Sequence, residues 1–143
     1  MGEGPHASVQ KFFVRFLGNR EREWSIRVWP EQRVQTSPMH FRVPDVTVTR
    51  SSAPFEDIVT VAPLLCIEIL SRDDRMSDMQ ERVDDYLAMG VCMVWIVDPR
   101  RRKTFQTDGL SLQPVEELTV PGTEIVVAKG EVFAELDELK SAQ

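Results

Sequence analysis

The sequence has few cysteines and histidines, and it has no long apolar run. Only two cysteines and two histidines occur in 143 residues, at spacings that do not suggest a zinc site. Both Cys66 and Cys92 lie in apolar, strand-like runs, which favours two buried free thiols over a disulfide. No run approaches the ~20 apolar residues of a membrane span, and residues 1–10 lack the pattern of a signal peptide. We therefore expect a cytoplasmic protein with no membrane partner.

Positive charge is also scarce. The chain carries 17 Lys and Arg against 23 Asp and Glu, a net charge of −6, which argues against a passive nucleic-acid coat. Residues 1–50 carry eight basic and five acidic side chains, whereas residues 51–98 carry three and ten. The acidic middle of the chain suits a cation site. The length predicts a single domain over residues 1–143.

Apolar periodicity predicts alternating strands and helices. Helical stripes cover residues 7–17 and 71–90, the second with a capping box of Ser77 and Gln80 and a stop at Gly90. Strand patterns cover residues 24–29, 41–49, 64–70, 91–99, 104–107 and 120–128, and a short helix closes the chain. Pro44 indicates an edge strand or a bulge. The strand–helix–strand unit of residues 64–97 predicts a parallel pair within a mixed sheet, and hence an α/β or α+β fold.

Glu68 is the one charged residue in the apolar run of residues 64–70. Burying an unpaired carboxylate is costly, so proteins pair it, protonate it or give it a metal ion. Asp45 lies in another predicted strand, in the sequence VPDV. If the two strands are neighbours, the two carboxylates meet, and Mg²⁺ typically binds one or two carboxylates together with water.

The segments VPDVTV, CIEILS and ERVDDYLAMGVCMVWIVDP, in this order and spacing, resemble the bacterial putative restriction endonuclease family, formerly a domain of unknown function. That family lies in the PD-(D/E)xK superfamily, and the resemblance runs from about His6 to the last helix. It implies a restriction-endonuclease-like mixed sheet flanked by helices. It also implies a hydrolase, an endonuclease that cleaves DNA with Mg²⁺ or Mn²⁺. Asp45 and Glu68 would be catalytic metal ligands, Glu31 a further ligand, and Arg42 a supporting or phosphate-contacting residue.

The sequence departs from the family pattern at the lysine. Leu70 stands where the (D/E)xK motif needs lysine, and Arg82 stands where the family often moves that lysine, onto the following helix. Arginine stays protonated, so it cannot act as a general base, but it can stabilise developing charge on a phosphate. The alternative is therefore a catalytically inactive nuclease-like fold that acts as a binding or regulatory module.

Structural interpretations compete with these functional ones. Glu68 would then form a buried ion pair with Arg42 or Arg82, and Arg82 a surface pair with Asp78 or Asp85. Residues 100–103, RRRK, are either a solvated hairpin tip or a phosphate-contacting patch. Neither His6 nor His40 has a partner at ligand spacing, so neither receives a role, although His40 lies near Asp45 in sequence. A homodimer is expected because a small nuclease must reach both DNA strands.

Overall fold

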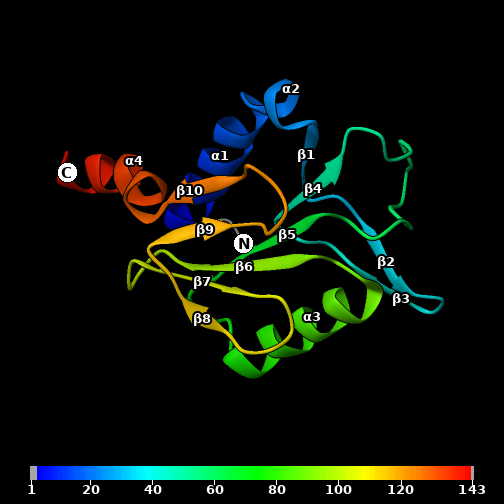
Figure 1. Ribbon diagram of the computed structural model, residues 1–143. Coiled ribbons are helices and arrows are strands. Elements are labelled where there is room, and N and C mark those ends of the chain that lie inside the picture. The colour runs from blue at the N-terminus through cyan, green and yellow to red at the C-terminus, as the bar shows by residue number, and fades with distance from the viewer. Residues whose placement is uncertain (1–2, 143) are drawn as a thin grey trace.

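The computed structural model describes residues 3–142, and Figure 1 shows how their helices and strands are arranged. The helices are α1 (Gly4–Gly18), α2 (Glu21–Trp24), α3 (Met76–Met89) and α4 (Lys129–Ser141). The strands are β1 (Ile26–Pro30), β2 (Val34–Ser37), β3 (His40–Arg42), β4 (Val46–Arg50), β5 (Leu65–Ile69), β6 (Met93–Asp98), β7 (Lys103–Thr107), β8 (Gln113–Pro114), β9 (Glu117–Thr119) and β10 (Val126–Ala128). No helix in this part of the chain has the length and apolar character to cross a membrane.

Six strands form one mixed sheet in the order β1-β4-β5-β6-β7-β8. Strands β5 and β6 are parallel, and the other neighbouring pairs are antiparallel. A parallel pair needs a crossover connection, and helix α3 provides it. The predicted parallel unit and the predicted fold class, a mixed sheet flanked by helices, are both confirmed.

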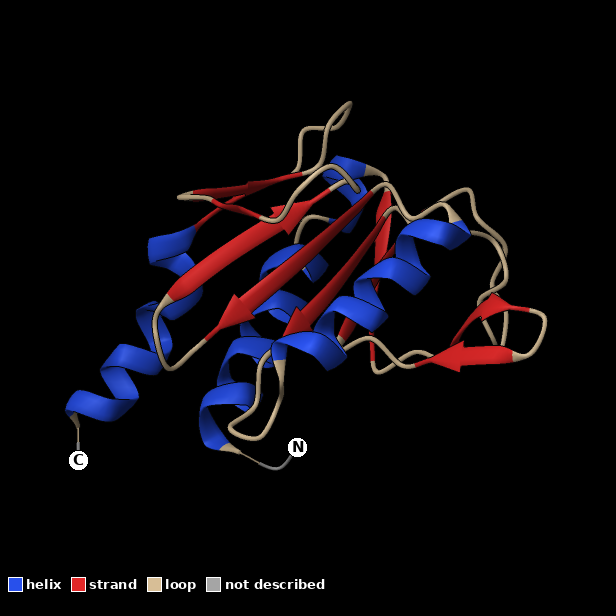
Figure 2. Cartoon of the chain, turned by 90° about the horizontal axis from the view of Figure 1, so that it is seen from below, coloured by secondary structure: helices blue, strands red, loops and turns tan. Residues whose placement is uncertain are grey.

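Helices cover both faces of this sheet. Helices α1 and α4 pack on one face, where Phe13 and Trp95 belong to the larger apolar cluster, and α3 packs on the other, where Met79 and Val83 belong to a second one. Figure 2 shows α3 lying across its face of the sheet, with the β2–β3 hairpin standing away from it. Because both faces are covered, β5 is buried along its whole length, and Glu68 is its one charged residue.

The segment predicted as one strand over residues 41–49 is two strands. The chain leaves β3 at Arg42 and enters β4 at Val46, and Pro44 lies in the break. Proline lacks the N–H that a ladder position needs. The strand after the break lies between β1 and β5. Pro44 therefore marks the end of an inner strand, and not a sheet edge.

Three local predictions are wrong and one is confirmed. Helix α3 begins at Met76 with Arg75 as N-cap and no side-chain cap, so Ser77 lies inside the helix and forms no capping box. Trp24 ends helix α2 and does not begin a strand. Cys92 is exposed and Cys66 buried, both as free thiols. The helix stop at Gly90 is confirmed, with a left-handed φ of 108° that favours glycine.

Candidate active site

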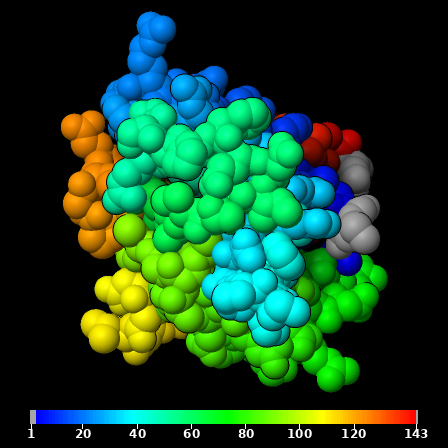
Figure 3. Space-filling view, turned by 90° about the vertical axis from the view of Figure 1, so that its right-hand side faces the viewer, coloured from blue at the N-terminus to red at the C-terminus, as the bar shows by residue number. Residues whose placement is uncertain are grey.

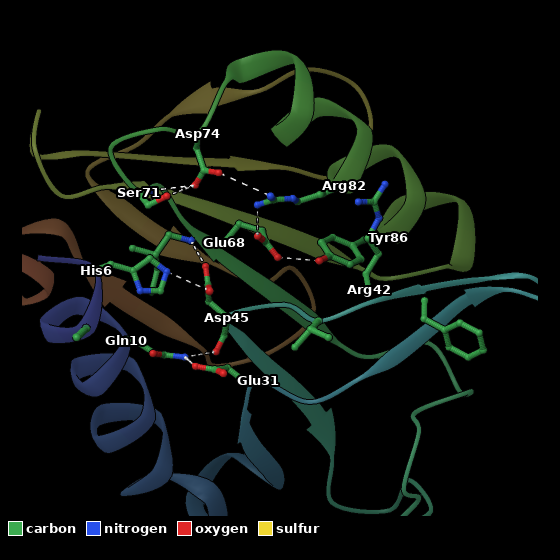
Figure 4. A pocket seen from close by; sticks show the side chains of 14 residues that line it. His6, Gln10, Glu31, Arg42, Asp45, Glu68, Ser71, Asp74, Arg82 and Tyr86 are labelled. Atoms are coloured by element: carbon green, nitrogen blue, oxygen red, sulfur yellow. Dashed lines mark hydrogen bonds and ion pairs between the residues drawn. The ribbon is translucent and has the colours of Figure 1, made fainter. Parts of the chain in front are cut away.

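A cavity of about 590 Å³ opens at the end of strand β5, between the N-terminal half of α1, helix α3 and strand β3. Figure 4 shows the polar side chains that point into it. They come from helices α1 and α3, strands β3 and β5, and the loops that follow β1, β3 and β5, and the sheet brings these segments together. Asp45 precedes β4 and Glu68 is the fourth residue of β5.

Asp45 and Glu68 are cross-strand neighbours. Strands β4 and β5 pair with Val46 opposite Ile67, so the next antiparallel position sets Asp45 opposite Glu68. Directly opposite residues project on the same face of a sheet. Both line the cavity, and the negative charge of Asp45 raises the pKa of Glu68. The two carboxylates therefore share one electrostatic site.

Glu68 is almost fully buried, with 3% of its side chain exposed. The Tyr86 hydroxyl donates to its Oε2 at 2.7 Å, and the Arg82 guanidinium contacts its Oε1 at 3.2 Å. Burial and, after it, the charge of Asp45 raise the pKa of Glu68 to about 7, although both partners lower it. Without a bound cation, the carboxyl therefore holds a proton part of the time at neutral pH.

Asp45 is held by partners from two other elements. Its Oδ2 accepts the backbone N–H of Ile69 at 2.7 Å, and its Oδ1 lies 3.1 Å from Nε2 of His6 in α1. The hydrogen bond to Asp45 raises the pKa of His6. Gln10, one turn further along α1, donates to the Asp45 carbonyl at 2.9 Å. The orientation of Asp45 is thus fixed from β5 and from α1.

Arg82 links the acidic residues on the other side of the cavity. Besides Glu68, it lies 3.6 Å from Oδ1 of Asp74, whose Oδ2 accepts the N–H and hydroxyl of Ser71. A guanidinium has five N–H donors, and these contacts leave some of them for a ligand. The predicted surface pair of Arg82 with Asp78 or Asp85 is absent among the described residues; the pair with Glu68 is present.

Two other predicted residues lie at the rim. Glu31, with a left-handed φ of 48°, accepts a hydrogen bond from Gln10 at 3.2 Å and is exposed. Arg42 forms an ion pair with Asp85 at 2.9 Å and does not contact Glu68. Both residues line the cavity. Their side chains are bound to neighbours other than the two central carboxylates.

The chain is similar to known proteins in sequence and in fold. Residues 1–124 match the model of the Uma2 family, described as putative restriction endonuclease. The chain belongs to this family. Among solved structures, it is similar to a putative nuclease of the DUF820 family from Anabaena variabilis, with a TM-score of 0.82 and 23% identity over 95% of this chain and 84% of the other. That likeness supports the fold alone. A comparison with curated proteins gives no significant match.

The structure brings together part of the site predicted from the family resemblance. Asp45, Glu68 and Arg82 surround one cavity, with Glu31 and Arg42 at its rim. Sequence reasoning missed His6, which lies 39 positions before Asp45 and reaches it only through the packing of α1. His40, which is much nearer to Asp45 in sequence, is exposed and bonds Ser37 instead. Distance along the chain was therefore a misleading signal for these two histidines.

A divalent cation fits the two central carboxylates. Within residues 3–142, no group of three or more His, Cys, Asp or Glu side chains is arranged to hold a metal ion. Mg²⁺, however, needs only one or two carboxylates and completes its shell with water and substrate oxygens. Each carboxylate oxygen has two lone pairs, so the present hydrogen bonds leave acceptor capacity. Burial and, after it, the charge of Asp45 raise the pKa of Glu68, and a bound cation would offset the negative charge of the two carboxylates.

Proposed function

We propose that the protein is a metal-dependent endonuclease that hydrolyses phosphodiester bonds of DNA. The observation that supports this most strongly is the pair Asp45 and Glu68, opposite each other on neighbouring strands and open to one cavity. Membership of a family described as putative restriction endonuclease supports this reaction class. The single domain predicted over residues 1–143 would carry the function.

The proposed roles follow from the contacts. Asp45 and Glu68 would hold Mg²⁺ or Mn²⁺, and Glu31 would assist from the rim directly or through water. When bound, such an ion activates water and neutralises charge on the phosphate. Arg82 would direct its unused N–H donors at a phosphate oxygen and stabilise the charge that develops there. Arg42, which is paired with Asp85, would support the site or contact a phosphate from the rim.

His6 would keep Asp45 in position. Its Nε2 lies beside Oδ1, and the Ile69 N–H holds Oδ2. A carboxylate that is fixed in this way pays little entropy when it binds a cation, which is the usual role of groups behind a metal ligand. His6 is therefore a positioning residue in this proposal.

A second candidate function is a binding or regulatory module without catalysis. Leu70 and Arg82 occupy the positions of the family lysine, so the site has no lysine base. In addition, Glu68 already has both oxygens hydrogen-bonded within the protein, as in a structural buried pair. This candidate keeps the fold and gives the two acids a structural role.

A plasmid-nicking assay with Mn²⁺ tests the proposal. We expect nicking by the wild type that EDTA abolishes and that Asp45→Ala removes, with calorimetry showing divalent-ion binding to the wild type and none to Asp45→Ala. Leu110→Ala, in an exposed loop away from the cavity, is the control and should behave as the wild type. Equal traces of nicking in all three would indicate contamination, and the non-catalytic function would then be favoured.

We also propose that the protein acts as a homodimer, because one active site per chain cuts one DNA strand at a time. DNA is the proposed substrate and the proposed macromolecular partner.

A further inference from the structure

A second cavity lies on the other side of the turn that follows β5. Its volume is about 350 Å³, at the lower end of the range for small-molecule sites. It shares Ser71 and Asp74 with the candidate active site, so this turn is the common wall of the two cavities. A polymer bound at the active site would extend into this neighbouring cavity.

Three cations border this second cavity without an acidic partner. Arg72, Arg101 and Lys103 are exposed and line it, and no ion pair holds their side chains among residues 3–142. Arg100, the fourth cation of this lining, contacts Glu3 at 2.8 Å, and the Glu3 carboxylate also accepts the Arg72 backbone N–H. Arg102 contacts Asp137 at 2.6 Å.

The two acidic residues that line the same cavity, Asp74 and Asp98, already accept hydrogen bonds within the protein. Asp98 accepts the backbone N–H groups of Arg100 and Arg101 with Oδ1. Asp74 uses Oδ2 on Ser71 and Oδ1 on Arg82. Neither acid pairs with a cation that borders the second cavity. The positive charge there remains available to an anion.

Side-chain contacts of Arg102 hold the hairpin that carries Arg101. Its four-residue loop joins Asp98 to Lys103, and Arg102 adopts a left-handed φ of 55°, which costs a non-glycine residue free energy. The Arg102 side chain bonds both Asp137 and the Pro99 carbonyl, which fixes the loop from its C-terminal side. Arg101 is thereby held on the cavity side of the hairpin with its guanidinium unpaired.

The floor of the cavity is apolar, formed by Leu70, Phe105 and the half-exposed Met76. Cations at the rim above an apolar floor match the chemistry of a nucleotide, whose phosphate is anionic and whose sugar and base have apolar faces. A free inorganic anion would use only the rim.

We propose that this second cavity binds the DNA nucleotide next to the phosphodiester at the active site, with its phosphate on Arg72, Arg101 and Lys103. The inference rests on the proposed nuclease function and extends it by naming a backbone subsite. It assigns a substrate-contacting role to the basic hairpin, residues 100–103.

Salt-dependent DNA binding tests this subsite. The affinity for a fluorescein-labelled duplex is measured by anisotropy in EDTA at several salt concentrations. We compare the wild type with Arg101→Ala/Lys103→Ala and with the control Arg22→Ala/Arg27→Ala. The control removes the same charge, but from a cavity at the start of β1. The candidate active site lies beyond the other end of that strand. The subsite holds one phosphate, and each lost phosphate contact lowers the slope of log K against log salt by about 0.9, so the hairpin variant should lose up to about 0.9 and the control nothing.

The outcomes separate the two proposals. A wild type that binds and nicks DNA, with a hairpin variant of unchanged slope, overturns the subsite and leaves the nuclease function intact. Equal losses in both double variants mean a general charge effect and also overturn it. A wild type that neither binds nor nicks DNA overturns both proposals. Arg101→Lys/Lys103→Arg, which keeps both charges, should retain the wild-type slope.

Discussion

At the scale of single residues, Glu68 is the centre of the candidate site, because its neighbours shift its pKa in opposite directions. Burial and Asp45 raise its pKa, whereas Tyr86 and Arg82 lower it. A raised carboxyl pKa in a cavity is typical of functional sites, although structural ion pairs also perturb pKa values. The same residue would therefore hold a metal ion in the nuclease and an internal ion pair in the inactive module.

The pH dependence of stability should report the state of Glu68 without metal. Its folded-state pKa of about 7 lies above the ordinary value of 4.5, so from pH 4.5 to 7 the unfolded chain loses a proton that the folded protein keeps. The free energy of unfolding should fall over this range by up to about 3 kcal/mol. Urea unfolding in EDTA should show that Glu68→Gln is as stable as the wild type or more so, with a margin that grows towards pH 7.

His6 contributes in the same direction but at higher pH. Its pKa is raised above 6.5, so its stabilisation is present below that value and is lost as the pH rises through the folded-state pKa. This contribution is present in both proteins, and their difference isolates Glu68. A difference that stays constant from pH 4.5 to 7.5 would contradict the prediction, and strong destabilisation by Glu68→Gln would favour the structural ion pair.

Substitutions of Arg82 distinguish a role of its positive charge in cleavage from a role in proton transfer. Arg82→Lys should keep or raise nuclease activity, because lysine stays cationic and is the residue the family carries. Arg82→Ala should lower the nicking rate by roughly 10²–10³, as when one transition-state donor is removed. It should also destabilise the fold by about 1–3 kcal/mol, since Glu68 loses a buried partner. Glu81→Ala, at an exposed neighbouring position on α3, is the control, and an inactive site would show no effect of Arg82 on cleavage.

The positioning role of His6 predicts a loss of metal affinity. His6→Ala removes the contact to Asp45 Oδ1 and should weaken Mn²⁺ binding by roughly 10–100-fold, the usual effect of removing a group behind a metal ligand. Calorimetric titration measures this directly. His40→Ala is the matched control because His40 is exposed and bonds Ser37. Equal affinities in the two variants would show that His6 does not orient Asp45.

At the scale of elements, the sequence predicts those parts of the fold that depend on local pattern. The run of residues 64–70 and the helix that follows indicate a buried strand and a crossover, and the structure has both. From the sequence, Pro44 indicates only an edge strand or a bulge, because local pattern does not show which strands lie beside it. Pairing Asp45 with Glu68 needed the strand order, and pairing Asp45 with His6 needed the packing of α1. Those are long-range contacts, which local periodicity does not encode.

The end of helix α3 gives a prediction at this scale. Gly90 has a φ of 108°, and a Cβ there would lie 3.4 Å from Cβ of Ala62. Gly90→Ala should therefore destabilise the protein by about 1–3 kcal/mol. Gly130→Ala is the control, because Gly130 lies in α4 with open space around it and the change should stabilise by about 0.4–1 kcal/mol. Urea unfolding measures both, and equal effects would mean that the left-handed conformation is not required.

At the scale of the whole molecule, charge and apolar surface are unevenly distributed. The acidic cavity adjoins the basic hairpin, through the shared wall at Ser71 and Asp74, and an apolar hairpin, whose Phe41 lines it. In the β2–β3 hairpin and the residue after it, Met39, Phe41 and Val43 are 83%, 48% and 51% exposed. Figure 3 shows this hairpin, in cyan, standing out from the surface next to the segment that follows β4. Large exposed apolar side chains gathered in five residues are typical of an interaction surface.

The proposed homodimer makes a prediction about this hairpin. If a second copy covers it, the protein should have a mass of twice 16.4 kDa by light scattering. Met39→Glu, in this hairpin but outside the lining of the active-site cavity, should shift the protein towards the monomer, because a charge buried in an interface is costly. Leu110→Glu, at a 91% exposed position in another loop, is the matched control and should leave the mass unchanged.

The dimer should linearise plasmid together with nicking it, whereas the monomeric variant should accumulate nicked circles. A wild type of 16.4 kDa at micromolar concentration would contradict the dimer, and the apolar hairpin would then have another partner.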